Sequence, residues 1–207
     1  MSTTLLFETI KIDEGKIFNL SYHQERMDES RKKLFLTQNT IHLKDHIHPP
    51  KKGLYKCRIV YAENIYSIEY IPYKKKQVHS LKIVSSPIKY EHKYVDRKTI
   101  NNLLSVCNDA DDILIEHNGY ICDTSIANIA FFDGKRWYTP EKPLLKGTMR
   151  AKLIDEGLLK TKKIKSSEIG NYTQVALMNA MIGFNVITDA KVTHNHTLHH
   201  LRSHYDY

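Results

Sequence analysis

The stretch that decides the fold is residues 118–150, NGYICDTSIANIAFFDGKRWYTPEKPLLKGTMR. Two turn dipeptides, Asn118-Gly119 and Asp133-Gly134, divide it into short runs rich in apolar and aromatic residues. Such dipeptides favour tight hairpin turns, because asparagine, aspartate and glycine tolerate positive φ. The pattern predicts four strands followed by a helix, at 111–116, 120–122, 128–132, 136–138 and 148–157.

The flanking segments continue this pattern of short strands and few helices. Upstream we expect a hairpin at 5–20, a helix at 22–36 capped by Ser21, a polar segment with a short helix at 37–52, a hairpin at 53–73 and a third strand at 80–84. We also expect a helix at 98–107 and, downstream, strands at 174–178 and 184–187. Together they predict an α+β fold with an N-terminal lobe at 1–84, an interdomain connection at 85–97 and a second lobe at 98–207.

Length and composition indicate a globular protein. The chain has 207 residues, of which 41% are hydrophobic, enough to bury a core. It has no apolar run near the roughly 20 residues that cross a bilayer, and its N-terminus lacks the order of a signal peptide. We therefore expect a cytoplasmic protein without membrane contact. Cys57, Cys107 and Cys122 are too far apart for a CxxC motif and are expected to be buried thiols.

The net charge of +8 favours an anionic partner. Nucleic acid is one candidate, but the lysine runs at 74–76 and 160–165 are typical of solvated connections, and no nucleic-acid-binding motif is present. A small anionic substrate is the better interpretation. Five histidines near the C-terminus raise the question of metal binding: His194, His196, His199, His200 and His204. A polar tail is favoured over a metal site, so we expect no bound metal.

Three features of the chain suggest a cofactor with an aldehyde, an aromatic nitrogen and a phosphate. Lys98 begins a predicted helix and, if desolvated, is an amine nucleophile, although a solvated surface lysine is the default. Asp123 follows a strand and is suited to hold a ring nitrogen protonated, or simply to cap a turn. Gly147 precedes a helix whose N-terminal N–H groups favour phosphate, or it only forms a turn.

These segments resemble the class IV aminotransferase family, the fold-type IV enzymes that use pyridoxal 5'-phosphate (PLP). The resemblance covers nearly the whole chain, in family order: FETIKIDEGKIFNLSYHQERM at 7–27, DRKTINNLL at 96–104, DTSIANIAFF at 123–132, TPEKPLLKGTMR at 139–150 and LMNAMIGFNVI at 177–187. It implies a two-lobed fold like that of D-amino-acid aminotransferase, with a small N-terminal α/β sandwich and a C-terminal pseudo-barrel lobe. It also implies a homodimer.

The same resemblance implies roles for individual residues. Lys98 takes the position of the lysine that forms the Schiff base and moves protons. Asp123 takes the position against the pyridine nitrogen, where the family usually has a glutamate that is one methylene longer. The remaining matches imply contacts to the phosphate or its surroundings, at Arg26, Gly147, Thr148, Met149, Asn179 and Ala180.

Within the family, the sequence most resembles 4-amino-4-deoxychorismate lyase. Met149 and the pairs Ala127-Asn128 and Asn179-Ala180 are lyase-like. Possible contacts to a substrate carboxylate are Arg58, Arg97 and Tyr22, with structural salt bridges an equal alternative for the two arginines. An amino-acid transaminase acting on branched-chain or D-amino acids stays open, as does a PLP-binding homologue without catalysis.

Overall fold

The computed structural model describes residues 4–105, 107–194 and 197–201. The chain divides into two compact units, and each is described by itself. The first unit takes the residues up to Lys75 together with 92–96, and the second takes 76–91 together with the residues from Arg97 onward. This division differs from the expected lobes, because residues 76–84 belong to the second unit and the expected connection is shared between both.

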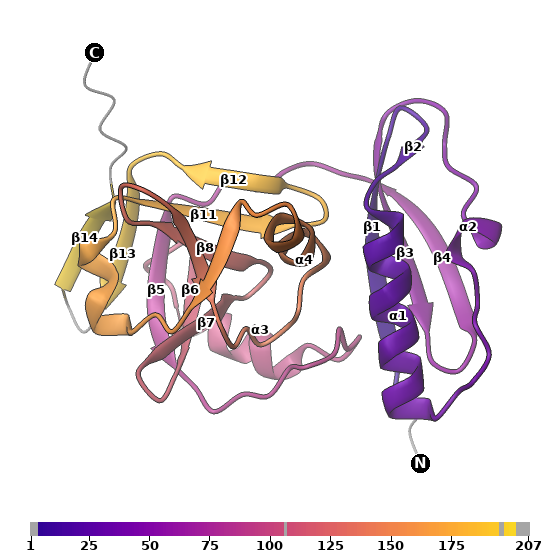
Figure 1. Ribbon diagram of the computed structural model, residues 1–207, viewed down its shortest axis with the longest axis horizontal. Coiled ribbons are helices and arrows are strands. Elements are labelled where there is room, and N and C mark those ends of the chain that lie inside the picture. The colour runs from indigo at the N-terminus through magenta and orange to yellow at the C-terminus, as the bar shows by residue number, and fades with distance from the viewer. Residues whose placement is uncertain (1–3, 106, 195–196, 202–207) are drawn as a thin grey trace. The chain divides into compact units, whose positions relative to one another are not determined.

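The first unit is an antiparallel sheet packed against one long helix (Figure 1). Its strand order is β2-β1-β3-β4, made of β1 (Leu6–Asp13), β2 (Lys16–Ile17), β3 (Leu54–Tyr61) and β4 (Ile65–Pro72). Helix α1 (Leu20–Phe35) places Met27 against the sheet, and the short α2 is Leu43–His46. Both expected hairpins and the short helix are therefore confirmed.

From Glu8 to Asp13, strand β1 alternates between a buried and a half-buried side. Leu6, Ile10 and Ile12 enter the core with Met27, as expected for a strand with one face covered by a helix. Glu8 shares their side and is fully buried. The expected start of α1 is wrong: the helix begins at Leu20 rather than Tyr22, after Asn19 in the left-handed region with φ 53°. Leu20 joins the helix because its side chain packs on the core.

The second unit consists of two five-stranded sheets around one core. One has the order β14-β13-β5-β6-β7, from β5 (Ser80–Ser85), β6 (Asp112–His117), β7 (Tyr120–Thr124), β13 (Ala190–His194) and β14 (Thr197–Leu201). The other has the order β10-β9-β8-β11-β12, from β8 (Asn128–Phe132), β9 (Trp137–Pro140), β10 (Leu159–Lys162), β11 (Gln174–Asn179) and β12 (Gly183–Ile187). The helical elements are α3 (Lys98–Ser105), α4 (Thr148–Asp155) and the 3-10 helix η1 (Ser166–Asn171).

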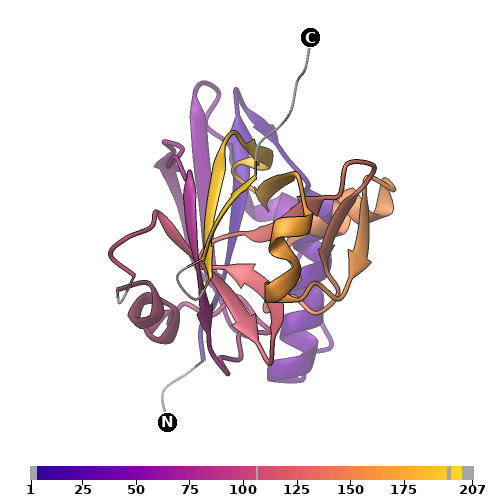
Figure 2. The same cartoon turned by 90° about the vertical axis from the view of Figure 1, so that its left-hand side faces the viewer.

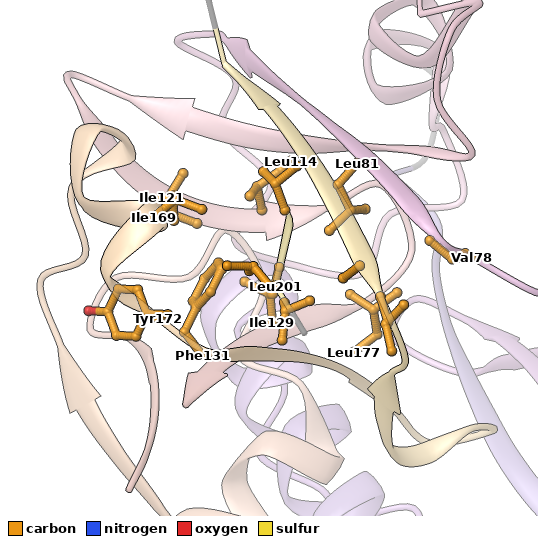
Figure 3. Packing of buried hydrophobic residues seen from close by; sticks show 14 of the residues in the cluster. Val78, Leu81, Leu114, Ile121, Ile129, Phe131, Ile169, Tyr172, Leu177 and Leu201 are labelled. Atoms are coloured by element: carbon orange, nitrogen blue, oxygen red, sulfur yellow. The ribbon is translucent and has the colours of Figure 1, made fainter. Parts of the chain in front are cut away.

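Apolar side chains from both sheets interdigitate in the core of this unit (Figure 3). Leu114 and Ile121 come from one sheet, and Ile129, Phe131 and Leu177 come from the other. The turn at Asn118 and Gly119 has positive φ at both residues, 51° and 81°, as the dipeptide predicts. This core holds β7, β8 and the segment before α4 in place, and these elements carry the expected cofactor residues.

Two expectations about the second unit are wrong. The strand expected to complete the first sheet, β5, instead pairs in parallel with β6 and β13, and Figure 2 shows it beside β13 despite their distance in sequence. The expected polar tail includes two paired strands, β13 and β14, whose alternate residues Ala190, Val192 and Leu201 are buried. The histidines between these apolar positions obscured the alternation. His196 and His204 lie outside the described residues.

The remaining composition-based expectations concern cysteines, metals and membranes. All three cysteines are buried. Among the described residues, no group of three or more His, Cys, Asp or Glu side chains is arranged to hold a metal ion. None of the helices in the described part of the chain is long and apolar enough to span a membrane. Lys160 and Lys162 lie on β10 instead of in a connection.

Candidate cofactor-binding site

Asp123 is a buried carboxylate in the last part of β7. The residue is only 4% exposed. Asn128 donates from Nδ2 to Asp123 Oδ1 at 2.7 Å, and the Leu145 N–H donates to Asp123 Oδ2 at 2.9 Å. Each oxygen of an ionised carboxylate has a second acceptor site. The two protein donors therefore orient the carboxylate and leave it able to accept a further hydrogen bond.

Burial dominates the ionisation of Asp123. Desolvation raises its pKa to about 7, against the lowering effects of the Leu145 and Asn128 hydrogen bonds and of the Arg150 charge. An ordinary aspartate has a pKa near ~4. A positive charge near this carboxyl group would stabilise its ionised form and lower its pKa.

The raised pKa of Asp123 predicts how stability depends on pH. The folded protein keeps the Asp123 proton between about pH 4 and pH 7 while the unfolded chain has lost it, so this stabilisation is complete below pH 4. This stabilisation is lost as the pH rises through about 7, and the free energy of unfolding falls by up to ~1.4 kcal/mol per pH unit. Asp123→Asn should remove this slope. Denaturant unfolding of the cofactor-free protein from pH 4.5 to 7.5 measures it, and parallel profiles for the two proteins would contradict the prediction.

Asn128 connects Asp123 to the loop that precedes α4. Its Nδ2 donates to the Leu145 carbonyl at 2.8 Å as well as to Asp123. Gly147, the N-cap of α4, lies so close to Asn128 that an added Cβ would overlap Asn128 Oδ1. The glycine is therefore required for close approach, and its φ of −72° is open to any residue. Sequence reasoning used Asn128 only as part of a lyase-like pair and did not assign it this bridging position.

The turn between β7 and β8 joins the other expected site residues. Arg97 donates from Nη2 to the Ser125 carbonyl at 2.5 Å, and this contact brings the first residue of α3, Lys98, towards the turn that follows Asp123. Asn179, at the end of β11, donates to the Ile126 carbonyl at 3.2 Å. The start of α3, the turn, the loop before α4 and the end of β11 therefore converge within the second unit.

Lys98 and the phosphate-site candidates have distinct surroundings. Lys98 is exposed at the start of α3, whereas Thr148 is buried at the start of α4. Met149 packs against a small cluster that includes Met178 and Leu153. Ala180 follows Asn179, whose Oδ1 accepts the N–H groups of the next two residues after Ala180 and closes the turn before β12.

Arg150 is a buried cation that sequence reasoning quoted within a motif without assigning it a role. It is 8% exposed, and its Nη2 donates to the Pro140 carbonyl at 2.9 Å. Its charge and that of Asp123 attract each other. The only sequence signal was an arginine in the first turn of a helix, where a cation is disfavoured by the helix dipole.

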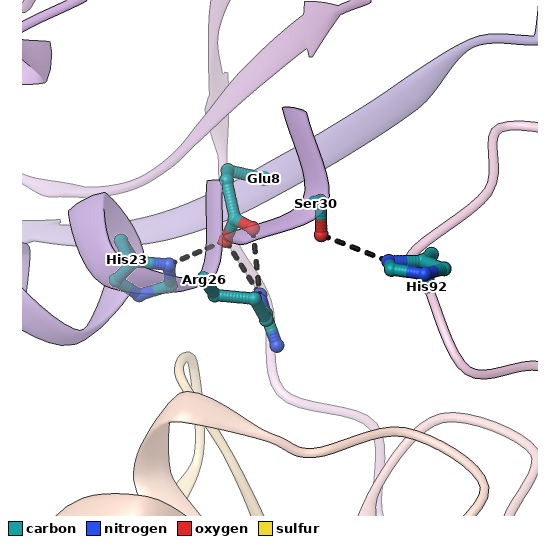
Figure 4. A network of polar contacts seen from close by, with 5 residues as sticks. All are labelled: Glu8, His23, Arg26, Ser30 and His92. Atoms are coloured by element: carbon teal, nitrogen blue, oxygen red, sulfur yellow. Dashed lines mark hydrogen bonds and ion pairs between the residues drawn. The ribbon is translucent and has the colours of Figure 1, made fainter. Parts of the chain in front are cut away.

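Arg26 belongs to the first unit and is held by a buried carboxylate. Arg26 donates from Nε and Nη2 to the two oxygens of Glu8, at 2.9 and 2.5 Å, and His23 Nδ1 lies 2.6 Å from Glu8 Oε2 (Figure 4). Burial raises the pKa of Glu8, but the Arg26 charge and the His23 hydrogen bond lower it to about 2. Burial lowers the pKa of His23, so it donates as a neutral ring. Ser30 and His92 form a separate hydrogen bond at 3.0 Å, which Figure 4 also shows.

The expected substrate contacts have structural partners. Arg58 lies on β3, 3.7 Å from Glu69 and over the Phe7 ring. Arg97 binds the Ser125 carbonyl as described above, and Tyr22 is half-buried on α1. The expected structural salt bridge is thus present for Arg58, whereas the contact given for Arg97 is a hydrogen bond to a backbone carbonyl. Their contact with a substrate stays a prediction.

A cavity of about 520 Å³ lies next to this site in the second unit. Its wall includes Cys122 and Leu144, the neighbours of Asp123 and Leu145, and lysines at 89, 142, 162 and 163 surround it. Lys98, Asp123 and Thr148 are not among its lining residues. The convergent residues around the turn after β7 therefore form a site separate from this cavity.

The chain is similar in sequence to a known family and to known proteins. The sequence model of the family "Amino-transferase class IV" matches residues 5–189. A Haemophilus influenzae protein without a functional name is 37% identical over 86% of this chain and 98% of its own length. A Schizosaccharomyces pombe protein named "Putative aminodeoxychorismate lyase" is 28% identical over 87% of each chain.

Solved structures with similar folds carry similar descriptions. A Haemophilus somnus structure described as "a putative 4-amino-4-deoxychorismate lyase" has a TM-score of 0.82 and 35% identity, covering 88% of this chain and 99% of its own. A Mycobacterium tuberculosis structure described as "a hypothetical aminotransferase", in its PLP-bound form, has a TM-score of 0.75 at 12% identity, over 92% of this chain and 81% of its own. At that identity the second likeness shows the fold alone. The expected α+β fold is confirmed.

Proposed function

This chain belongs to the class IV aminotransferase family, a PLP-dependent family, and from that premise we propose that it is a lyase that converts 4-amino-4-deoxychorismate to 4-aminobenzoate and pyruvate. The observation that carries the proposal is the likeness to the Haemophilus somnus protein of that description, at 35% identity and a TM-score of 0.82 over 88% of the chain. The Schizosaccharomyces pombe relative carries a corresponding name and adds support.

The residues of the second unit fit PLP as the cofactor. Asp123 is a buried carboxylate with acceptor capacity left, which suits a protonated ring nitrogen. Gly147 and the start of α4 present a helix N-terminus, which suits a phosphate. For Arg26 of the first unit, whose guanidinium is oriented by Glu8, a contact with the phosphate stays a prediction. Thr148, Met149, Asn179 and Ala180 complete the phosphate surroundings.

When bound, PLP supplies an electron sink for the bond that breaks beside the substrate amine. Lys98 then acts as the proton carrier: it takes the proton from the ring carbon that bears the amine and returns one to the methylene carbon of the departing enolpyruvyl group. The substrate ring becomes aromatic as pyruvate leaves. Atoms and electrons therefore balance without a keto-acid acceptor. Asp123 keeps the ring nitrogen of the cofactor protonated throughout.

The charge of the protein supports an anionic substrate. Aminodeoxychorismate has two carboxylates, and the chain carries a formal net charge of +8. Arg58, Arg97 and Tyr22 are the proposed carboxylate contacts. We also propose that the protein is a cytoplasmic homodimer and that it does not bind nucleic acid. Salt-dependent binding to DNA or RNA would contradict the proposal about nucleic acid.

The test is to incubate purified, PLP-loaded protein with 4-amino-4-deoxychorismate and no keto acid. We expect 4-aminobenzoate and pyruvate in equal amounts. If no product forms but a keto acid and an amino acid exchange their amino group, the protein is a transaminase. If the protein binds PLP and does neither, it is a non-catalytic homologue. Either of these results overturns the lyase proposal.

A further inference from the structure

Helix α3 has little packing of its own. Among its residues 98–105, which the structure describes in full, only Ile100 is buried, and the others are half-buried or exposed. Its first backbone hydrogen bond runs from the Asn101 N–H to the Arg97 carbonyl at 2.9 Å. A short helix with one buried side chain gains little from packing and opens easily. The position of Lys98, its first residue, therefore depends on contacts at the start of the helix.

The turn after β7 offers a fixed acceptor for such a contact. The Thr124 N–H donates to the Ala127 carbonyl at 2.9 Å, and Thr124 Oγ1 accepts from the Ala127 N–H at 3.1 Å, which closes the turn. Asn179 of β11 donates to the Ile126 carbonyl at 3.2 Å. Ser125 lies inside this turn and is only 5% exposed. The Ser125 carbonyl is thus held relative to both sheets of the second unit.

Arg97 joins the start of α3 to this turn. Its Nη2 donates to the Ser125 carbonyl at 2.5 Å, in a partly buried hydrogen bond. A charged donor makes a shorter and stronger hydrogen bond than a neutral one. The chain re-enters the second unit at Arg97, after residues 92–96 of the first unit. Arg97 therefore fastens the returning chain to the second unit one residue before Lys98.

We propose that Arg97 is a positioning residue that anchors the start of α3 on the turn after β7 and so holds the Lys98 amine in place for the cofactor aldehyde. The part that concerns the cofactor rests on the proposed function, whereas the anchoring belongs to the protein before any cofactor binds. The bond to Ser125 uses only part of the guanidinium, so a substrate carboxylate is a compatible second partner. Anchoring acts on Lys98 without substrate, and the two roles are therefore separable.

The first measurement uses the cofactor-free protein. In Arg97→Met, hydrogen exchange of the Asn101 amide, followed by NMR, should become at least about tenfold faster, the factor expected for one lost hydrogen bond to a charged group. Denaturant unfolding of the same variant separates this local opening from a loss of global stability. If Arg97→Met does not fold, Arg97→Gln, whose shorter side chain cannot make the same contact, takes its place. An unchanged exchange rate overturns the inference even if the lyase activity is found.

The second measurement follows the Lys98 amine itself. After PLP is added, the visible band of lysine-bound PLP should form about tenfold or more slowly in Arg97→Met, because a misplacement of about 1 Å can cost a reacting group up to ~10²-fold in rate. Arg97→Lys, which keeps a charged donor, should lie closer to the wild type. Turnover of Arg97→Met should show a lower kcat at an unchanged KM. A change confined to a higher KM would assign Arg97 to the substrate carboxylate alone and overturn the inference.

Two control variants separate anchoring from general effects. Arg136→Met removes an exposed positive charge from the same unit, and Ser105→Ala removes a hydrogen bond at the other end of α3. Both should keep the wild-type rates of band formation and of Asn101 exchange, and equal changes in either control overturn the inference. If the wild-type protein forms no band of lysine-bound PLP, the cofactor part of the inference fails with the proposed function. Exchange at Asn101 then still decides whether Arg97 anchors α3.

Discussion

Replacing Lys98 with alanine is expected to reduce turnover by on the order of 10³-fold or more, because the variant loses both the amine that bonds the cofactor and the proton carrier. The visible absorbance band of lysine-bound PLP should disappear as well. The fold should not suffer, since Lys98 is exposed at the first residue of α3 and alanine favours helices. We expect the free energy of unfolding to stay within about 0.5 kcal/mol of wild type.

The matched control is Lys160→Ala, which removes an exposed lysine from β10 of the same unit. It should keep both the band and the turnover. Absorbance spectra, the steady-state rate of 4-aminobenzoate release and denaturant unfolding give the three measurements. A Lys98→Ala protein that retains the band and turns over at the wild-type rate would exclude Lys98 as the reactive lysine.

Gly147→Ala is expected to have the second largest effect. The new methyl group would overlap Asn128 Oδ1, so Asn128 must move away from Asp123 and from the Leu145 carbonyl. A buried hydrogen bond to a carboxylate and a partly buried one to a carbonyl are then lost, which predicts a destabilisation of about 2–4 kcal/mol. PLP affinity should fall at least about tenfold, because the Asp123 carboxylate and the start of α4 no longer keep their positions.

Gly170→Ala separates local crowding from damage to the site. A Cβ there would approach His199 Nδ1 at 2.8 Å, and that imidazole side chain belongs to β14. The control should lose some stability and keep its PLP affinity once folded. Denaturant unfolding and PLP titration of both variants test the prediction. Equal PLP affinities for Gly147→Ala and wild type would show that the contact with Asn128 has no part in the site.

Local signals in the sequence predicted most elements of the fold correctly. The alternation in β1 and the turns at Asn118-Gly119 and Asp133-Gly134 depend on neighbouring residues, and the hairpins β1–β2, β6–β7 and β8–β9 formed as expected. The order of the motifs around Lys98, Asp123 and Gly147 identified the family for the same reason. The spacing of residues within a short segment can be recognised from the sequence without knowing which strands pair.

Other features depended on partners far along the chain. β5 could join either unit from its own residues, and only its parallel pairing with β6 and β13 places it in the second. The histidine-rich end pairs as β14 with β13 because Ala190, Val192 and Leu201 are buried, which composition did not indicate. A strand's local pattern specifies its faces but not its neighbours.

The sequence by itself determined the family, the set of chemically relevant residues and most strand and helix positions. Only the tertiary structure decided how those residues interact: Asn128 bridges Asp123 and Leu145, Arg97 holds the turn at Ser125, and Arg150 is buried with its Nη2 donating to the Pro140 carbonyl. The physical reason is that ionisation and hydrogen bonding depend on burial and on through-space neighbours. Both arise from packing between segments distant in sequence.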